Sequence, residues 1–368
     1  MATVDPPESG PPLSELAGVF RVYEARQDGE QLVYYGEPLV PHDALMERVW
    51  PRFRERGYEV TLTEQMGEHV LVAEPIDVSV DGIPWTNVGL FLATVLSTLY
   101  AGTAWYYVRE PLADPVGTVL TVWPFVVAVL GVLGIHELGH YAMSRYHDVD
   151  ATLPYFIPFP TIIGTMGAVI RMKGQMPDRR ALFDIGVAGP LAGLVATVVV
   201  TAIGLSMPPI EVPAWVYTTP STVEFHFGKP LLFRAIAAVM GVDPEYRNPI
   251  VFGGWVGMFV TFLNLLPVGQ LDGGHIVRAL LGKRQATVAA AVPAALFGLA
   301  GYLYYVEDAG SAVGLWAFWG LLALVFAFAG PAHPIHEEPL DGGRKLVGLL
   351  TLVLGLLCFT PVPIAIVS

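Results

Sequence analysis

Long stretches without a charged residue dominate the chain after residue 85. Each has at least 20 residues, and seven of them cover 86–108, 116–135, 185–210, 248–271, 286–306, 309–332 and 346–368. A helix of about 20 apolar residues spans the hydrocarbon core of a bilayer. The pattern therefore predicts an all-α polytopic membrane protein with about seven transmembrane helices. A shorter apolar stretch at 230–242 contains Arg234, and we expect it to be interfacial or re-entrant.

The first 85 residues follow a different pattern, with short segments separated by turn residues. Alternation of apolar and polar residues predicts strands, and an acidic first turn before spaced apolar residues predicts a helix. The predicted strands are 19–23, 31–35, 58–63 and 69–73, and the predicted helix is 41–56. We therefore expect a disordered tail at 1–13, a small soluble α+β domain at 14–85 and a membrane-embedded domain at 86–368.

Composition and charge support this division. Hydrophobic residues make up 54% of the chain and charged residues 14%, as is typical of a membrane protein. Residues 1–85 hold 16 acidic and 6 basic side chains, so they carry −10 of the whole chain's net charge of −13. This acidity argues against binding to nucleic acid. Because the chain has 16 Arg but only 4 Lys, we also expect a salt-loving, halophilic host.

Arg and Lys in the short loops predict the orientation in the membrane. They gather at 145–180, 278–284 and 344–345, whereas the loops at 109–115, 211–228 and 306–309 are acidic. Since basic loops stay in the cytoplasm, the N-terminus is expected there and the C-terminus outside. The first residues lack the basic-then-apolar pattern of a cleavable signal peptide. We expect a multi-pass protein of the cell membrane.

His136-Glu137-Leu138-Gly139-His140 directly follows the uncharged stretch 116–135. Residues four apart share one face of a helix, so the two histidines can bind one metal ion with Glu137 beside the bound water. The alternative is a pair of surface histidines on a soluble helix. It fits poorly, because an ionised Glu near a membrane costs about 2.5–3.5 kcal/mol and is a functional candidate by default. The motif predicts a hydrolytic metal site at the cytoplasmic end of its span.

A catalytic zinc site takes a third protein ligand and keeps one position open for water. The single cysteine, Cys358, lies in the last apolar stretch, which excludes a cysteine-based zinc site. Asp272 interrupts an apolar region on the cytoplasmic side. Asp is also a common helix N-cap, and a new helix is expected after it. Because the histidine pair needs a carboxylate at this depth, we favour the ligand role for Asp272.

The segment 152–173 is too rich in proline and glycine to be a spanning helix. Its residues 168–172 can extend as a strand. Irregular backbone at membrane depth is tolerated only when it is buried in protein or lines a wet cavity. A free strand edge there can pair with an unwound substrate by strand addition. The alternative is a packed re-entrant loop without substrate contact. The substrate-binding candidates are Gly164, Gly167, Ala168, Val169 and Ile170.

Two further features favour structural roles. Gly189 and Gly193 form a small-residue pattern that allows two membrane helices to pack closely. His333 and His336 are followed by two glutamates, and a solvated turn is favoured over a gating role or a secondary metal site.

Several separated motifs together resemble the site-2 protease family of intramembrane zinc metalloproteases. The resemblance covers about residues 85–345, with its core motifs at 130–280. Within the family it is to the branch that includes plant chloroplast proteases of the ethylene-dependent gravitropism-deficient and yellow-green type. The motifs lie at 136–140, 154–158, 164–170, 183–193 and 264–274.

The resemblance implies a role for each of these residues. His136, His140 and Asp272 would bind one Zn²⁺, and Glu137 would be the catalytic base. Asn264 would donate a hydrogen bond to the substrate or to the developing oxyanion. For Asn264 the alternative is that it satisfies helix backbone near Pro267.

The expected function is an intramembrane zinc metalloendopeptidase that cleaves transmembrane protein substrates within the lipid bilayer. One alternative is a membrane transporter that uses the same three ligands as a transit site for metal. It would want ligands along a path through several spans, and the other apolar stretches lack His, Asp and Glu. The second alternative is a catalytically silent membrane scaffold. Ligation alone does not require Glu137, so its presence argues against that alternative.

Overall fold

The computed structural model describes residues 9–65, 67–76, 82–218, 224–246 and 248–367. It divides into two compact units. The first contains residues 1–82 together with 173–178 and 333–338, and the second contains the rest. Of the expected disordered tail, residues 1–8 lie outside the described residues, and a short helix α1 (Leu13–Leu16) begins at its end.

The first unit is a four-stranded antiparallel sheet with a helix packed on it. The strand order is β1-β2-β4-β3. Buried side chains of helix α2 meet the sheet, for example where the rings of Phe53 and Tyr34 lie edge to face with centroids 5.4 Å apart. The elements are β1 (Phe20–Asp28), β2 (Gln31–Pro38), α2 (His42–Arg54), β3 (Tyr58–Gln65) and β4 (Glu68–Pro75).

Two segments from later in the chain complete this unit. Strands β9 (Met176–Asp178) and β11 (Pro334–His336) pair in parallel. The backbone N–H of Gln175 donates to the Glu59 carboxylate at 2.8 Å, and its side-chain amide donates to the carbonyl of Val60 at 3.1 Å. Strand β3 therefore hydrogen-bonds the chain shortly before helix α5 begins at Arg179.

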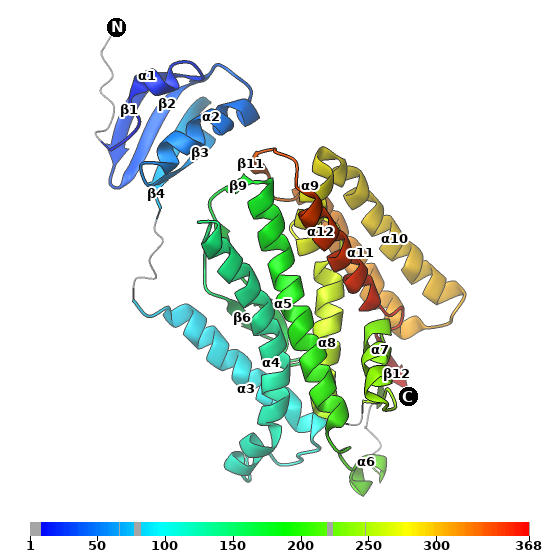
Figure 1. Cartoon of the computed structure of the whole chain (residues 1–368). Helices are drawn as coiled ribbons and strands as arrows, with labels where there is room; N and C mark the ends of the chain where they lie inside the picture. Colours follow the sequence, from blue (N-terminus) through cyan, green and yellow to red (C-terminus); the bar gives the residue numbers. More distant parts are fainter. Residues whose placement is uncertain (1–8, 66, 77–81, 219–223, 247, 368) are drawn as a thin grey trace. The chain divides into compact units, whose positions relative to one another are not determined.

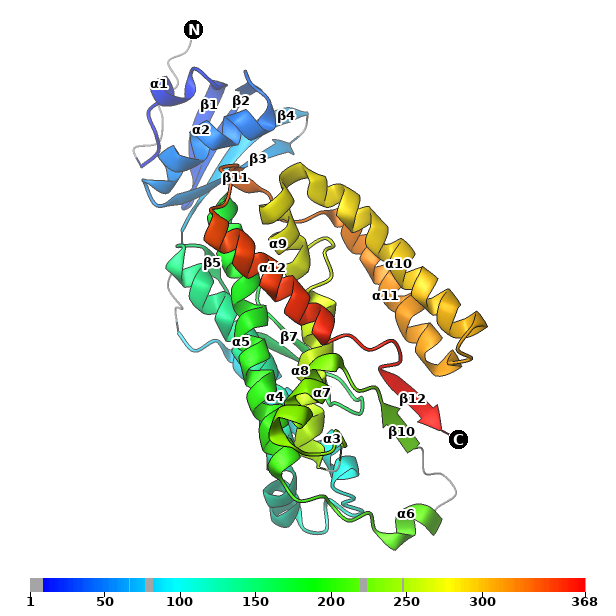
Figure 2. The same ribbon diagram turned by 45° about the vertical axis from the view of Figure 1, so that its right-hand side comes forward.

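The second unit is a bundle of apolar helices. Helices α4, α5 and α8 lie side by side at its centre, and α10 and α11 form an adjacent pair (Figure 1). Helix α12 runs along α5, and a short strand pair, β10 with β12, lies near the C-terminus (Figure 2). The helices are α3 (Trp85–Trp105), α4 (Pro115–Tyr146), α5 (Arg179–Ser206), α8 (Pro249–Asn264), α9 (Asp272–Leu281), α10 (Gln285–Tyr305), α11 (Gly310–Ala329) and α12 (Gly342–Leu357).

Within the described residues, five helical stretches are long and apolar enough to cross a membrane, with α9 and α10 counted as one. The predicted total of seven is not confirmed. The stretch 248–271 contains α8, and the stretch 346–368 contains the last twelve residues of α12; each helix has 16 residues. Sixteen residues rise only about 24 Å, less than a hydrocarbon core of about 30 Å. Pro267 and Pro361 follow the two helix ends closely, so each uncharged stretch continues beyond its helix.

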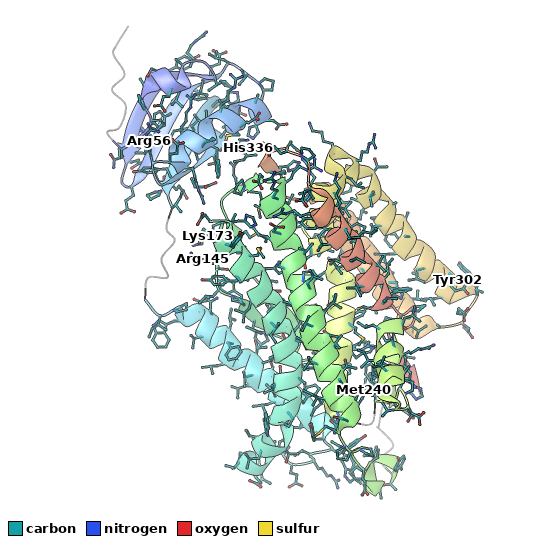
Figure 3. All side chains as sticks on the ribbon, viewed as in Figure 1. Arg56, Arg145, Lys173, Met240, Tyr302 and His336 are labelled. Carbon is teal, nitrogen blue, oxygen red and sulfur yellow. The ribbon has the colours of Figure 1, made fainter. Side chains whose placement is uncertain are left out.

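The remaining elements of this unit are short. Helix α7 (Leu231–Met240) has 10 residues, which rise about 15 Å, so it does not span. Arg145, in the last turn of α4, and Met240 lie toward opposite ends of the unit (Figure 3). The other short elements are β5 (Asp150–Ala151), β8 (Met172–Lys173), α6 (Ala214–Thr218), β10 (Glu224–Phe227) and β12 (Ile364–Val367).

The proline-rich segment forms an antiparallel hairpin of β6 (Tyr155–Pro158) and β7 (Thr165–Val169). The strand predicted at 168–172 is therefore placed three residues too late. Gly164 has a φ of +83°, which reverses the chain immediately before Thr165 and starts the strand there. Beyond Val169 the chain leaves the hairpin, and Met172 pairs in a separate sheet with β5.

Candidate metal centre

His136 and His140 lie one turn apart on the buried face of α4. Their side chains are 3% and 5% exposed, which is unusual for two adjacent polar rings in an apolar bundle. Their Nε2 atoms are 3.2 Å apart. The Nδ1 atom of His140 lies 2.8 Å from the carbonyl oxygen of Ile185 on α5. With the Nδ1 hydrogen donated to that carbonyl, the neutral ring presents its Nε2 lone pair to His136.

Asp272 reaches the same point from α9. Its Oδ2 lies 3.2 Å from Nε2 of His136, and its Oδ1 lies 3.2 Å from Nε2 of His140. Leu271 holds the N-cap position, so Asp272 is the first helical residue and its carboxylate is not used as a cap. Gly273 and Gly274 follow, and a side chain on either would collide with the backbone carbonyls of residues 265–269. The two glycines thus allow α9 to start close to the end of α8.

The three side chains fit a metal ion. Nitrogen and oxygen ligands at about 2.0–2.1 Å in tetrahedral geometry lie about 3.3 Å from one another, which matches the 3.2 Å separations. Asp272 Oδ2 is buried without a hydrogen-bond partner. Lone pairs that face one another in an apolar interior are costly unless a cation lies between them. Within the part of the chain that the structure describes, these three residues form the one cluster with this ligand geometry.

Two glycines of α5 form the wall behind the histidines. A methyl group on Gly189 would collide with the ring of His140, and one on Gly193 would lie 2.9 Å from Nδ1 of His136. From the sequence we predicted that Gly189 and Gly193 serve general helix packing. Their partners are in fact the two histidines, which follow the same four-residue spacing on α4. The equal four-residue spacing of the glycine pair and the histidine pair was the sequence feature that could have indicated this contact.

Glu137 lies beside the histidines and is 7% exposed. Ile170 comes just after β7, which packs on α4, the helix that carries Glu137. The other substrate-binding candidates are spread along the hairpin. Ala168 pairs with β6, and Val169, at the end of β7, is 49% exposed. Gly164 instead packs on the backbone of α3, while the Cβ position of Gly167 is open.

Asn264 is the last residue of α8, and its Nδ2 lies 3.3 Å from Nε2 of His136. The structure therefore places this amide at the edge of the histidine–aspartate cluster. His333 and His336 are not part of the cluster. His336 belongs to β11 in the first unit, where its Nδ1 lies 3.9 Å from the Glu47 carboxylate.

Asp184 is a residue whose role sequence reasoning missed. It lies on α5 directly before Ile185, whose carbonyl accepts the hydrogen bond from His140. Nε2 of His147, just beyond the end of α4, lies 3.0 Å from its Oδ2. Asp184 therefore ties the end of α4 to the part of α5 that orients a ligand histidine.

Comparison with known proteins places this geometry in a family. The profile of peptidase family M50 matches residues 124–305. The chain is 28% identical over 344 residues to the probable zinc metalloprotease EGY2, chloroplastic, of Arabidopsis thaliana, covering 90% of this chain and 59% of that protein. It is 32% identical over 302 residues to the probable zinc metalloprotease EGY1, chloroplastic, of the same plant, covering 74% and 52%.

A third relative covers even more of the chain. The probable zinc metalloprotease EGY3, chloroplastic, of Oryza sativa subsp. indica is 26% identical over 378 residues, covering 93% of this chain and 62% of that protein. The chain thus spans between about half and three fifths of the length of these relatives. No solved structure matches. The profile match contains His136, His140 and Asp272, and it coincides with the helices that bring them together. Residues 124–305 of this chain belong to peptidase family M50, the site-2 protease family.

Proposed function

We propose that this protein is an intramembrane zinc metalloendopeptidase that hydrolyses peptide bonds in transmembrane helices. The observation that carries the proposal is the convergence of His136, His140 and Asp272 beside Glu137, inside an M50 domain. The relatives are named as probable zinc metalloproteases, which supports the same metal here.

His136, His140 and Asp272 would hold one Zn²⁺, which when bound supplies a Lewis acid that polarises the scissile carbonyl and acidifies a water molecule. Glu137 accepts the proton of that water and delivers it to the leaving amine. Asn264 Nδ2, at the edge of the cluster, donates to the substrate carbonyl as negative charge develops on it. The apolar walls of α4, α5 and α8 strengthen both interactions by excluding bulk water.

Substrate would reach Glu137 as an extended strand. A transmembrane helix hides its peptide bonds in its own hydrogen bonds, so it must unwind before attack. β7 pairs with β6 along one edge only, within the residues that the structure describes. We assign the other edge of β7, from Thr165 to Ile170, to pairing with substrate by strand addition. Gly164 is not part of this edge, since its carbonyl accepts hydrogen bonds from Ser97 and Phe159. The packing of β7 on α4, the helix that carries Glu137, supports this assignment, because it brings the strand close to the proposed base.

The basic residues of the short loops support a membrane orientation with the acidic N-terminal domain and the metal site on the cytoplasmic side. The five apolar helical stretches support a multi-pass protein. We assign it to the cell membrane of a salt-adapted host on the charge balance of the chain, whereas the relatives are named as chloroplast proteins.

The transporter and scaffold alternatives are less well supported. A transporter needs ligands along a path, and a single cluster of metal-binding geometry occurs among the described residues. A scaffold does not need a carboxylate at Glu137.

The test is cleavage of a membrane substrate by the purified full chain. The protein in detergent is incubated with a peptide containing one transmembrane helix, with and without a zinc chelator. We expect cleavage that stops with chelator and returns when zinc is added back. Metal transport into vesicles without cleavage of any substrate would support the transporter and contradict the protease.

A further inference from the structure

Several backbone carbonyls in and beside the hairpin of β6 and β7 lie outside its ladder of strand hydrogen bonds; of these, that of Gly164 also accepts from the backbone N–H of Phe159 at 3.3 Å. At membrane depth such groups lack water, so an unpaired carbonyl there is strongly unfavourable. The carbonyls of Leu153, Pro154, Ile162 and Gly164 all accept hydrogen bonds from side chains of one helix, α3.

Three polar side chains of α3 supply these bonds. Asn87 Nδ2 donates to the carbonyls of Leu153 at 2.9 Å and Pro154 at 3.2 Å. Ser97 Oγ donates to Gly164 at 2.5 Å, and Trp105 Nε1 donates to Ile162 at 2.8 Å.

The outer face of α3 is apolar. It carries the exposed apolar side chains Leu92, Leu96 and Tyr100, spaced four residues apart as on a lipid-facing surface. The hydroxyls of Thr94 and Thr103 donate to carbonyls of α3 itself, whereas the bonds of the three donors to other elements all go to the hairpin segment.

The donors support the hairpin along the whole length of α3. From Asn87 to Trp105 the helix rises about 27 Å at about 1.5 Å per residue. Their acceptors, Leu153 and Ile162, lie on either side of β6, which packs on α3. The chain turns after Phe159, where the backbone N–H of Thr161 donates to the Phe159 carbonyl at 2.8 Å. Figure 1 shows β6 beside this helix.

Packing reinforces the same contact. Phe91 of α3 and Phe156 of β6 meet edge to face with ring centroids 5.1 Å apart. A side chain on Gly164 would lie 2.6 Å from the carbonyl oxygen of Ser97, so only glycine permits this approach. On its far side the hairpin packs through β7 on α4, the helix that carries Glu137. A continuous series of contacts thus joins α3 to the helix of the proposed base.

We propose that α3 is the positioning element for substrate, and that Asn87, Ser97 and Trp105 fix the register in which an unwound helix is presented to Glu137. This rests on the proposed protease function. A substrate strand paired to β7 can slip by two residues and keep its backbone bonds. With the chain held on both sides of β6, at Leu153 and Pro154 before it and at Ile162 and Gly164 after it, β7 stays at one height relative to Glu137, and one peptide bond of the substrate is selected.

The test compares variants that remove the donors with controls that remove equivalent bonds elsewhere. The test variants are Asn87→Leu, Ser97→Ala and Trp105→Phe, singly and together. Trp105→Phe removes the N–H donor and keeps an aromatic ring against Phe252, whose centroid lies 4.1 Å from that of Trp105. The matched control is Trp255→Phe, which removes an indole bond of 3.0 Å to Gly228. Thr103→Val is a second control, because its hydroxyl bonds only within α3.

Three measurements are made on the full-length protein in detergent. Hydrogen–deuterium exchange of residues 153–169 reports the hairpin itself. Zinc affinity reports the integrity of the metal site. Mass spectrometry of the cleaved peptide gives the position of the cut. In the triple variant we expect faster exchange of the hairpin, unchanged zinc affinity, and cuts spread over bonds two residues to either side. Both controls are expected to match the wild type.

Unchanged exchange in the triple variant would overturn the proposal, as would faster exchange with a single wild-type cut. Loss of zinc in the triple variant would also overturn it, because α3 would then support the metal site itself. If wild-type protein cleaves nothing, the protease function fails, and the exchange measurement still decides whether α3 holds the hairpin.

Discussion

The guanidinium of Arg344 makes two hydrogen bonds to the carboxylate of Asp184, from Nε at 2.8 Å and from Nη2 at 2.7 Å. A paired contact of this kind fixes orientation as well as distance. It joins the first turn of α12 to α5, and His147 joins α4 to the same carboxylate. The next residue, Ile185, accepts the Nδ1 hydrogen bond of His140. Asp184 thus holds in place the carbonyl that orients a proposed zinc ligand.

Replacing Asp184 by Ala is expected to weaken zinc binding by about 10–100-fold, the range found when residues that orient metal ligands are removed. Titration against a competing chelator measures it. The control is Asp341→Ala, which removes the exposed partner of Arg344 and leaves Asp184 paired. Equal zinc affinity in wild type and Asp184→Ala would show that the Ile185 carbonyl is held by α5 alone.

Gly189→Ala is expected to weaken zinc binding at least about tenfold, because the added methyl group displaces the His140 ring from its position. Gly131→Ala, on α4, is the matched control, since nothing lies within 4 Å of its Cβ position. Chelator competition on both variants makes the comparison. Normal zinc affinity in Gly189→Ala would mean that α4 and α5 separate without disturbing the site.

Glu137→Gln and Asp272→Asn are expected to fail in different ways. The amide at 137 cannot accept a proton, so cleavage falls by about 10²–10⁴-fold while zinc stays bound. The amide at 272 weakens ligation, so zinc and cleavage are lost together. Metal content and cleavage rate are measured on the same samples. Wild-type cleavage by Glu137→Gln would contradict its assignment as the base.

Asn264→Ala tests the amide beside His136. If it donates to the developing oxyanion, kcat falls by about 10²–10³-fold with zinc affinity preserved. A role in satisfying helix backbone near Pro267 would instead lower the thermal unfolding midpoint and leave kcat of the folded fraction unchanged. Steady-state kinetics and thermal unfolding together distinguish the two.

Acid stability should depend on Asp341, which caps α12. The backbone N–H of Arg344 at 3.0 Å and its guanidinium lower the pKa of this carboxyl to about 2. A lowered folded-state pKa stabilises the protein above the unfolded value of about 3.9, and the stabilisation disappears as the pH falls through 2. Asp341→Ala should therefore unfold at a lower temperature at pH 6, with the difference vanishing near pH 2. A constant difference across this range would contradict the linkage.

Local spacing explains what the sequence predicted well. The histidines are one turn apart, so a helix alone brings them together, and β1 to β4 follow simple alternation. Asp272 was identified because a charge in an apolar stretch needs a partner. The predicted number of seven transmembrane helices was not confirmed, because a stretch without charged residues need not be helical along its whole length. α8 ends at Asn264, and the loop to Asp272 completes the uncharged stretch.

Contacts between distant segments explain what the sequence missed. Asp184 and Arg344 are 160 residues apart, and no spacing links them. The roles of Asn87 and Trp105 on α3 could not be predicted for the same reason, because they depend on the hairpin lying against that helix. The strand of the hairpin was displaced by three residues because its start depends on the turn at Gly164, which apolar periodicity does not mark.

The length of α4 has a consequence for the lipid around it. Its 32 residues rise about 48 Å, well beyond a hydrocarbon core of about 30 Å. His136 follows Pro115 by 21 residues, so it lies about 32 Å along the helix, at the far boundary of a core that begins at Pro115. A bilayer thickened by a few ångströms submerges this turn, and a thinner one hydrates it. If this protein is the proposed protease, we therefore expect its cleavage rate to depend on the acyl-chain length of the surrounding lipid.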